Sequence, residues 1–410
     1  MANLLESVFA SLLLLPFFFS TGLAAPTGTA TGPSTGLSSC AASMDDSLPG
    51  EPPSDFEFSG NIRRYYIAAE QVLWDYVPSG WDNYEGVPIE KSFRAAAAGI
   101  TTEGSLGTKW QKALYRGYTD ATFTTPLPQP SWNGVNGPTL RAEVGDMIEI
   151  LFVNKLPTVY ASMHSMGLAY NKDNEGSLYP NNTMPGQNSA VAPGDAVAPG
   201  DCVVYKWLVN NGSAPTEGAL SHMWAYHSYI SMEQDMFAGL IGSTVVYSAG
   251  KMNSTMASHR EFVLVYMQYD ESNSIMSAVN KQYLTGNDQL VSTTNTPSPT
   301  TPESYGNFSI WEPQVINLMS SGQLNTTQAP TFSALNGLIF ANNAPFEVCA
   351  NDPTIWYVSA FGDNPHAFHM HGNGFMHGGD NMATISTSAF LLCPVHSLFP
   401  VKPGSIISGH

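Results

Sequence analysis

Short segments in which apolar and polar residues alternate run through most of the chain. Ile148, Ile150 and Phe152 show a period of two within residues 137–154. This period is typical of β-strands that bury one face. Similar segments lie at 63–76, 203–209, 240–247 and 261–269. Short strands separated by turn residues predict an all-β protein built from sandwiches or barrels.

The strand segments fall into two sets. Residues 270–335 are polar and rich in Asn, Ser, Thr and Pro, and a new set begins near 336–340. We therefore predict two β-sandwich domains, at 55–250 and 255–410. A chain of 410 residues, 43% of them hydrophobic, is long enough to fill two such cores.

The first residues have the pattern of an export signal. An apolar run at 11–19 is followed by small residues at 22–26, which predicts a signal peptide at 1–25 and a flexible leader at 26–54. No later segment is apolar over the length that a membrane span requires. Sequons of the Asn-x-Ser/Thr type, typical of secreted glycoproteins, occur at Asn181, Asn211, Asn253, Asn307 and Asn325. We therefore expect an extracellular glycoprotein.

Charge narrows the choice of partners. The formal net charge is −18, which argues against nucleic acid or an anionic membrane as a partner. An acidic protein attracts cations instead. The cysteines, Cys40, Cys202, Cys349 and Cys393, are far apart in the sequence, so their pairing is left open and none forms a short metal-binding motif.

Three histidines near the C-terminal end are the strongest sign of chemistry. His366, His369 and His371 are spaced His-x-x-His-x-His, and 369 and 371 fall on one face of an extended segment. A single histidine in an apolar strand is more often an ordinary buried residue, but three at this spacing indicate a metal site. Imidazole suits copper, zinc, iron or nickel. The sequence holds no His-Glu-x-x-His or Cys-x-x-Cys motif, which makes copper the first choice.

Two further histidines lie on separate predicted strands of the first domain. His164 stands in Met163–Gly167 and His227 in Tyr226–Tyr229, and each alone would more often be an ordinary half-buried residue. Together with other segments they carry a resemblance. Over about residues 60–382 the chain resembles the ceruloplasmin and hephaestin branch of the multicopper oxidases. The segments that carry it are 63–76, 137–154, 164–167 with 174–179, 226–229 with 239–242, 263–271 and the histidine triplet ending at Gly372.

The resemblance implies a fold and a reaction. The fold would be tandem cupredoxin-like Greek-key β-sandwich domains. The reaction would couple one-electron oxidation of Fe(II), Cu(I), or phenol and amine donors to the reduction of O2 to water. Copper would be the cofactor, with a type 1 copper that takes electrons from the substrate and a trinuclear cluster that reduces O2.

The resemblance also assigns roles by position. His366 resembles a type 1 ligand, and His164, His227, His369 and His371 resemble ligands of the cluster. Two-domain members of the family place this cluster between subunits, so a homo-oligomer is one expectation.

The chain departs from the family pattern at several positions. The first and second motifs of the family read His-x-His, but Met166 and Tyr229 stand at the second positions here. Thioether sulfur prefers Cu(I), and a neutral phenol is a poor ligand. The last family motif, His-Cys-His, is absent, so we expect the second domain to be incomplete at its C-terminal end. We interpret 383–397 as foreign sequence, such as a retained intron, which a continuous transcript would disprove.

Three functions remain open on this basis. The intact triplet His366, His369 and His371 favours a secreted ferroxidase-like oxidase. The substitutions at 166 and 229 favour a binding or structural module that works through protein contacts. A copper store or carrier would need only partial ligand sets.

Overall fold

The computed structural model describes residues 35–101, 105–177, 192–284, 330–362, 366–371, 373–377, 380–387 and 390–397. The predicted signal peptide and the sequons at Asn181, Asn307 and Asn325 lie outside these residues. The sequons at Asn211 and Asn253 are exposed. None of the helices in the described ranges is long and apolar enough to cross a membrane.

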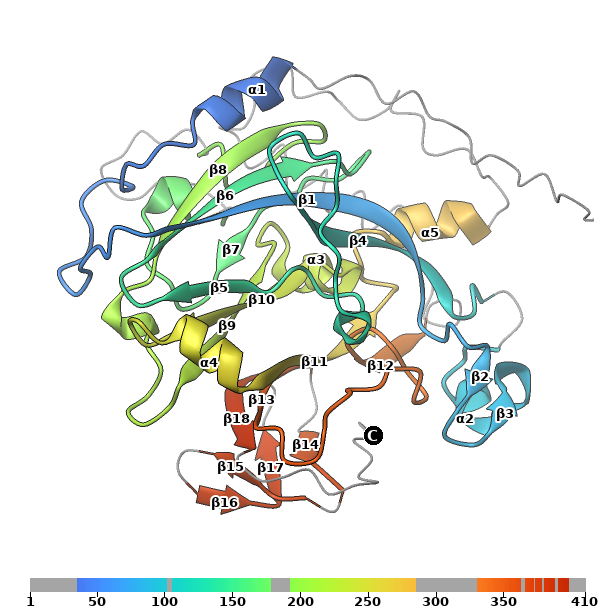
Figure 1. The fold of residues 1–410 in the computed structure, drawn as a ribbon. Coiled ribbons are helices and arrows are strands. Elements are labelled where there is room, and N and C mark those ends of the chain that lie inside the picture. The colour runs from blue at the N-terminus through green and yellow to red at the C-terminus, as the bar shows by residue number, and fades with distance from the viewer. Residues whose placement is uncertain are drawn as a thin grey trace, which may run out of the picture.

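Strands within residues 62–247 form two four-stranded sheets that pack as a sandwich (Figure 1), and we call this part of the chain the first domain. One sheet has the order β4-β1-β6-β8, in which β1 runs antiparallel to β4 and parallel to β6. The other has the order β5-β10-β9-β7, in which β10 runs parallel to β5 and antiparallel to β9. The strand bounds are β1 Ile62–Asp75, β4 Lys109–Tyr118, β5 Leu140–Glu143, β6 Met147–Asn154, β7 His164–Ser165, β8 Cys202–Leu208, β9 Ser221–His227 and β10 Ile241–Tyr247.

The core of this domain lies between the two sheets. Ile148, Ile150 and Phe152 of β6 are fully buried there against Tyr226 of the opposite sheet. The alternating pattern predicted this inward face, yet every residue of β6 is buried. The outer face is covered because Leu151 belongs to a second apolar cluster that packs on helix α1 (Thr35–Ala42).

The second domain is built on one larger sheet. Its strand order is β12-β11-β13-β18-β15-β16, and a separate pair is formed by β14 and β17. The bounds of these strands are β11 Arg260–Asp270, β12 Thr331–Leu335, β13 Thr354–Phe361, β14 His366–His369, β15 Phe375–His377, β16 Asp380–Met382, β17 Thr384–Thr387 and β18 Phe390–Ser397. Residues 383–397, interpreted above as foreign sequence, thus supply β17 and β18, and β18 pairs with β13 along its whole length.

Helices contribute little to the described fold, and the predicted all-β class is confirmed. The remaining elements are short: β2 Trp81–Asp82, β3 Val87–Pro88, η1 Ile89–Lys91, α2 Phe93–Ala97, η2 Ser131–Asn133, η3 Lys172–Asn174, η4 Asn211–Ser213, α3 Met232–Ala238, α4 Met252–Ser258 and α5 Ser277–Leu284. Residues 77–101 hold β2, β3 and α2 and form a small projection at one side of the molecule (Figure 1). We call this segment the 77–101 lobe.

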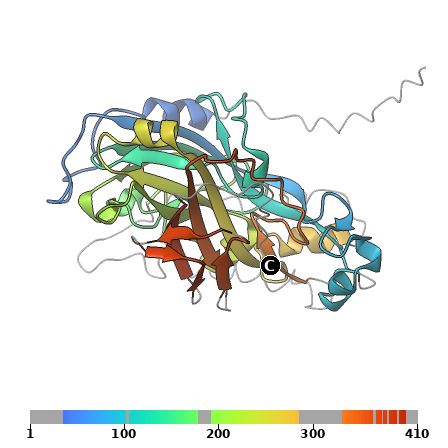
Figure 2. The same cartoon turned by 60° about the horizontal axis from the view of Figure 1, so that its bottom comes forward.

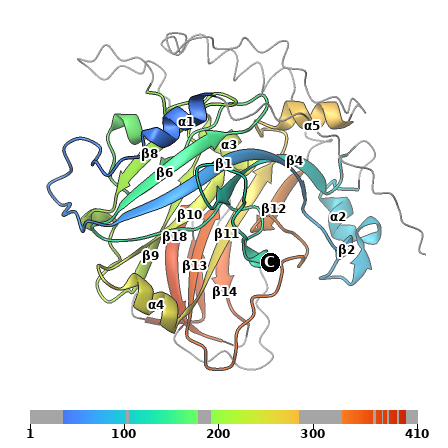
Figure 3. The same ribbon diagram turned by 45° about the horizontal axis from the view of Figure 1, so that its top comes forward.

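The two domains pack directly on each other, as the turned views show (Figures 2 and 3). One apolar cluster contains Met223 and Ile241 of the first domain together with Val263 and Tyr357 of the second. The orientation of the domains is therefore set by a shared core.

Candidate metal centre

His164 and His227 lie side by side in the first domain. They face each other in the register of β7 and β9, and their ring centroids are 5.5 Å apart. His227 is 2% exposed and His164 is half-buried. Two histidines that are distant in the sequence thus become neighbours because the short strand β7 adds to the edge of β9.

Backbone carbonyls orient both rings. The Nδ1 atom of each ring lies 2.8 Å from a carbonyl oxygen, that of Glu175 for His164 and that of Ser228 for His227. Because a carbonyl only accepts, Nδ1 carries the proton and donates it, which leaves Nε2 as the basic nitrogen. This arrangement is the usual one around metal-bound histidines.

Burial keeps both rings uncharged. Desolvation lowers the pKa of His164, and it lowers the pKa of His227 to about 4, with a further contribution from the neighbouring His164. Metal ligation requires the neutral imidazole. The pair is therefore ready to bind a metal ion at neutral pH without first losing a proton.

The residues at the two substituted positions lie in different surroundings. The Tyr229 ring is 4.8 Å from the His164 ring and 5.4 Å from the His227 ring, measured between centroids. Met166 packs instead against the apolar cluster that contains Met223 and Ala225. Tyr229 thus has ring contacts with both histidines of the pair.

Asp235 in α3 positions the turn that carries Tyr229. Its carboxylate accepts hydrogen bonds from the Ser228 hydroxyl at 2.7 Å and from the Ile230 and Ser231 N–H groups at 3.0 and 3.1 Å. Burial raises the pKa of this carboxyl group. Sequence reasoning missed Asp235, because an acidic residue in a short helix gives no signal until the fold places it beneath the turn.

A second histidine pair lies in the second domain. The Nε2 atoms of His369 and His371 are 3.2 Å apart, and the ring centroids are 4.9 Å apart. Two imidazole nitrogens that each lie about 2.0–2.1 Å from one metal ion are about 2.8–3.4 Å apart for ligand angles between square and tetrahedral. The separation of the two nitrogens therefore fits a shared ion.

His366 is set apart from this pair. It begins β14, three residues before His369, so the two side chains fall on opposite sides of the strand. Its ring packs on Tyr266 of β11 with centroids 3.9 Å apart, and its Nε2 atom is buried without a hydrogen-bond partner among the described residues. A basic nitrogen left in this state fits a missing ligand.

The structure does not gather the five predicted histidines into one site. Within the described residues, no group of three or more His, Cys, Asp or Glu is placed to hold a metal ion. What it brings together are two separate pairs, His164 with His227 and His369 with His371. The groups that contact these histidines, such as the carbonyl of Glu175 beside His164 and Tyr266 beside His366, were not predicted, because packing across strands leaves no mark in the local sequence.

These observations define a β-sandwich protein in which histidines of neighbouring strands come together. No protein-family model matches the chain. It is 30% identical over 327 residues to Ferroxidase HEPHL1 of Homo sapiens, an alignment that covers 77% of this chain and 25% of that protein. Ceruloplasmin of Homo sapiens is 28% identical over 338 residues, covering 79% and 29%.

One relative of a different kind also aligns. The non-catalytic subunit of the venom prothrombin activator omicarin-C from Oxyuranus microlepidotus is 37% identical over 223 residues, covering 52% of this chain and 14% of that protein. Among solved structures, a multicopper oxidase covers 87% of this chain with 85% of its own, at 17% identity and a TM-score of 0.45.

The chain belongs to the multicopper oxidase family and is a homologue of ferroxidases, hephaestin and ceruloplasmin. The resemblance predicted from the sequence motifs is thereby confirmed. The chain spans between 25% and 29% of the length of these ferroxidase, hephaestin and ceruloplasmin relatives.

Proposed function

We propose that this chain binds copper through its two histidine pairs and works as an extracellular oxidoreductase of the ferroxidase type. The observation that carries the proposal is the 3.2 Å separation of the Nε2 atoms of His369 and His371. The name Ferroxidase of the HEPHL1 relative supports Fe(II) as the electron donor and O2 as the acceptor. A phenol or amine donor is the alternative within the same reaction. The Cys40–Cys202 disulfide agrees with an oxidising compartment.

Each pair offers a half-complete ligand set. Copper, when bound, supplies the one-electron chemistry that protein side chains lack. His164 and His227 contribute neutral nitrogens that carbonyls hold in one tautomer, and His369 and His371 contribute nitrogens that already converge. His366 lies apart from both pairs with its ring on Tyr266, and as a single ligand it adds no copper to this count.

Oxygen reduction requires more ligands than either pair provides. We propose that copies of the chain associate so that histidines of both domains can meet. An identical partner repeats the substitutions at Met166 and Tyr229, so the assembled site would still hold fewer imidazoles than the family pattern. Slow turnover is the expected consequence.

Copper analysis of the purified secreted protein tests the binding proposal. We expect about two coppers per chain, one for each pair. The double variants His164→Ala/His227→Ala and His369→Ala/His371→Ala should each lose about one copper. The control is His259→Ala, which should lose none, because His259 lies outside both pairs and its ring is hydrogen-bonded to Ser258. Full copper content in both double variants would refute the assignment.

Oxygen uptake with Fe(II) tests the reaction separately. We expect oxygen uptake that depends on both pairs. Its rate per chain should rise with protein concentration, because assembly is needed. Copper binding without any uptake would retain the metal sites and reject the oxidase.

A second candidate is a cupredoxin module that acts through protein contacts. Met166 packs against the shared core, and one relative is described as a non-catalytic subunit. This reading predicts less than one copper per chain and no oxygen uptake at any protein concentration.

A further inference from the structure

A cavity of about 260 Å³ lies between the 77–101 lobe and the second domain. Its walls come from α2 and the residues after it, from Tyr266 of β11, from β12, and from residues 338–343, which follow β12. In Figures 1 and 3 the lobe stands beside β12 at the same edge of the molecule. Neither histidine pair lines this cavity.

Hydrogen bonds hold the two sides of the cavity together. The Asn342 side chain accepts from the Ser79 hydroxyl at 2.6 Å and donates to the carbonyl of Trp81 at 3.0 Å. The Asn83 N–H donates to the carbonyl of Phe340 at 3.1 Å. These hydrogen bonds fix the lobe to the second domain, so the cavity exists before any ligand binds.

The turn at the mouth stores backbone strain. Phe340 and Ala341 have φ angles of 52° and 53°, consecutive left-handed positions occupied by residues other than glycine. Such positions cost energy and persist where the surroundings enforce them, which is common at binding sites. Here the enforcing contacts are those of Asn83 and Asn342.

The lining combines an apolar interior with one cation. Ile100, Phe332 and Ile339 are buried walls, and Arg94 is the charged residue among those that line the cavity. The Arg94 guanidinium lies 4.0 Å from the centroid of the Tyr84 ring, and its Nε is 3.3 Å from a carboxylate oxygen of Glu85. Glu85 lies on the Nε side without a hydrogen bond to it, and within the described part of the chain no hydrogen bond engages the two terminal NH2 groups, which leaves them for a ligand.

We propose that this cavity binds a small single-ring aromatic molecule that carries a carboxylate. The apolar walls accept the ring, and the fork of the guanidinium matches a carboxylate. The volume is below the range of drug-sized sites, which limits the ligand to about one ring. A metal cation is disfavoured because neither a carboxylate nor an imidazole lines the cavity.

The overall charge of −18 does not prevent this. Salt reduces interactions between exposed charges beyond about 8 Å at physiological ionic strength. A carboxylate in contact with Arg94 therefore experiences the local guanidinium more strongly than the distributed acidic surface. The anion is selected by position and not by net charge.

One residue that lines the cavity, Tyr266, is also in contact with His366. Tyr266 lines the cavity and packs on the His366 ring at 3.9 Å between centroids. A ligand that shifts Tyr266 would change the environment of that imidazole. Binding itself needs no copper, so this proposal stands apart from the proposed function.

Calorimetric titration of the copper-free full chain with 4-methylbenzoate tests the proposal. This probe has one ring and one carboxylate and resists oxidation, so binding is read without turnover. We expect one site with a Kd of about 0.1–1 mM. Arg94→Gln should weaken binding about tenfold, and the uncharged isostere 4-methylbenzamide should bind the unaltered protein correspondingly weakly.

Matched controls separate the cavity from the rest of the surface. Arg260→Gln changes an arginine of similar exposure that is paired with Asp352, and it should leave the Kd unchanged. Ala98→Trp should block the cavity, whereas Ala97→Trp, an exposed neighbour that does not line it, should not. Melting temperatures of these variants verify that they fold.

A nuclear magnetic resonance spectrum of the histidine rings provides the second readout. We expect the His366 ring signals to move with 4-methylbenzoate and those of His164 to stay. No binding at 5 mM, which is about five times the weakest Kd expected, or equal binding by Arg94→Gln and Ala98→Trp, would overturn the proposal.

Discussion

His227 is governed by two opposing influences on one imidazole. The hydrogen bond to the carbonyl of Ser228 favours a proton on the ring, while burial disfavours the charge, and burial dominates. The pKa of His227 in the folded protein is therefore about 4, and the ring stays neutral at any pH above that value. In the unfolded chain the same ring regains a pKa of about 6.5.

This difference predicts acid sensitivity of the copper-free protein. As the pH falls below about 6.5, the unfolded chain binds a proton at His227 that the folded protein does not, so the free energy of unfolding falls. The contribution is about 2 kcal/mol between pH 7 and pH 5. Urea unfolding at both pH values measures it. His227→Gln should show a smaller drop by that amount, and an identical drop in both proteins would contradict the prediction.

The two substituted positions predict different outcomes when histidine is restored. Tyr229→His would add a third imidazole beside His164 and His227, because the ring it replaces already contacts both. Copper affinity of this pair should rise about tenfold or more. Met166→His would place an imidazole against the apolar shared core, and it should lower stability by about 1–3 kcal/mol with no gain in affinity. Competition with a copper chelator and urea unfolding measure both effects.

At the scale of elements, α1 illustrates how a distant segment completes a strand. Leu37 and Met44 in and near this helix pack on the outer face of β6, and the Cys40–Cys202 disulfide joins the helix to the start of β8. The two cysteines are 162 positions apart in the sequence, so the disulfide closes a long loop. A crosslink over so long a loop removes much of the freedom of the unfolded chain.

Removing the crosslink should therefore destabilise the protein. We expect Cys40→Ser/Cys202→Ser to lower the free energy of unfolding by about 2–5 kcal/mol. Cys349→Ser is the matched control, because Cys349 is exposed and unpaired, and it should change stability by less than about 0.5 kcal/mol. Urea unfolding of both variants decides. Equal stability of the double variant and the unaltered protein would mean that α1 contributes little.

At the scale of the whole molecule, one pair of opposite charges is buried between the two domains. Lys112 of β4 is fully buried, and its Nζ lies 2.5 Å from Glu271, which directly follows β11 in the second domain. Burial lowers the pKa of Lys112 and raises that of Glu271. The Tyr76 hydroxyl donates to the same carboxylate at 2.5 Å. Such a pair tolerates loss of both partners better than loss of one.

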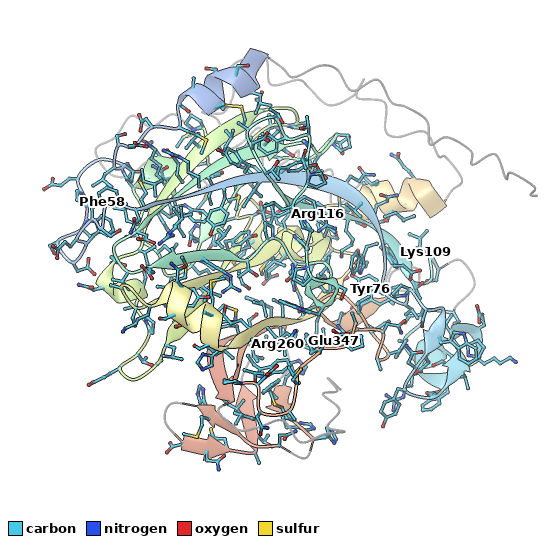
Figure 4. The ribbon with its side chains drawn as sticks, viewed as in Figure 1. Phe58, Tyr76, Lys109, Arg116, Arg260 and Glu347 are labelled. Carbon is cyan, nitrogen blue, oxygen red and sulfur yellow. A yellow bond between two sulfur atoms is a disulfide. The ribbon has the colours of Figure 1, made fainter. Side chains whose placement is uncertain are left out.

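A double-mutant cycle of Lys112→Met, Glu271→Leu and the combined variant tests this interdomain contact. Lys112→Met leaves a carboxylate buried beside one hydroxyl and should cost about 3–5 kcal/mol, while Lys112→Met/Glu271→Leu should recover part of the loss. Lys109→Met is the control, because Lys109 is exposed and 3.9 Å from Asp75, and it should cost less than about 1 kcal/mol. Figure 4 labels Lys109 and Tyr76. Additive losses in the double variant would argue against a coupled pair.

The sequence by itself determined several of the strands and the family. The alternation at Ile148, Ile150 and Phe152 marked the inward face of β6, because the pleat of a strand fixes which side each residue faces. The histidine triplet and its companions indicated the family, because ligand residues and their spacing are local properties. Residues 383–397 supply β17 and β18. Because strand pairing needs only compatible backbone, the interpretation of this segment as foreign sequence stays a prediction.

Only the tertiary structure decided which groups meet. It placed the Tyr229 ring beside both histidines of the first pair, and it separated His366 from His369 and His371 by packing it on Tyr266. It also buried Lys112 against a glutamate 159 positions away. These contacts join strands far apart in the chain, so they follow from the packing of sheets and not from any local pattern.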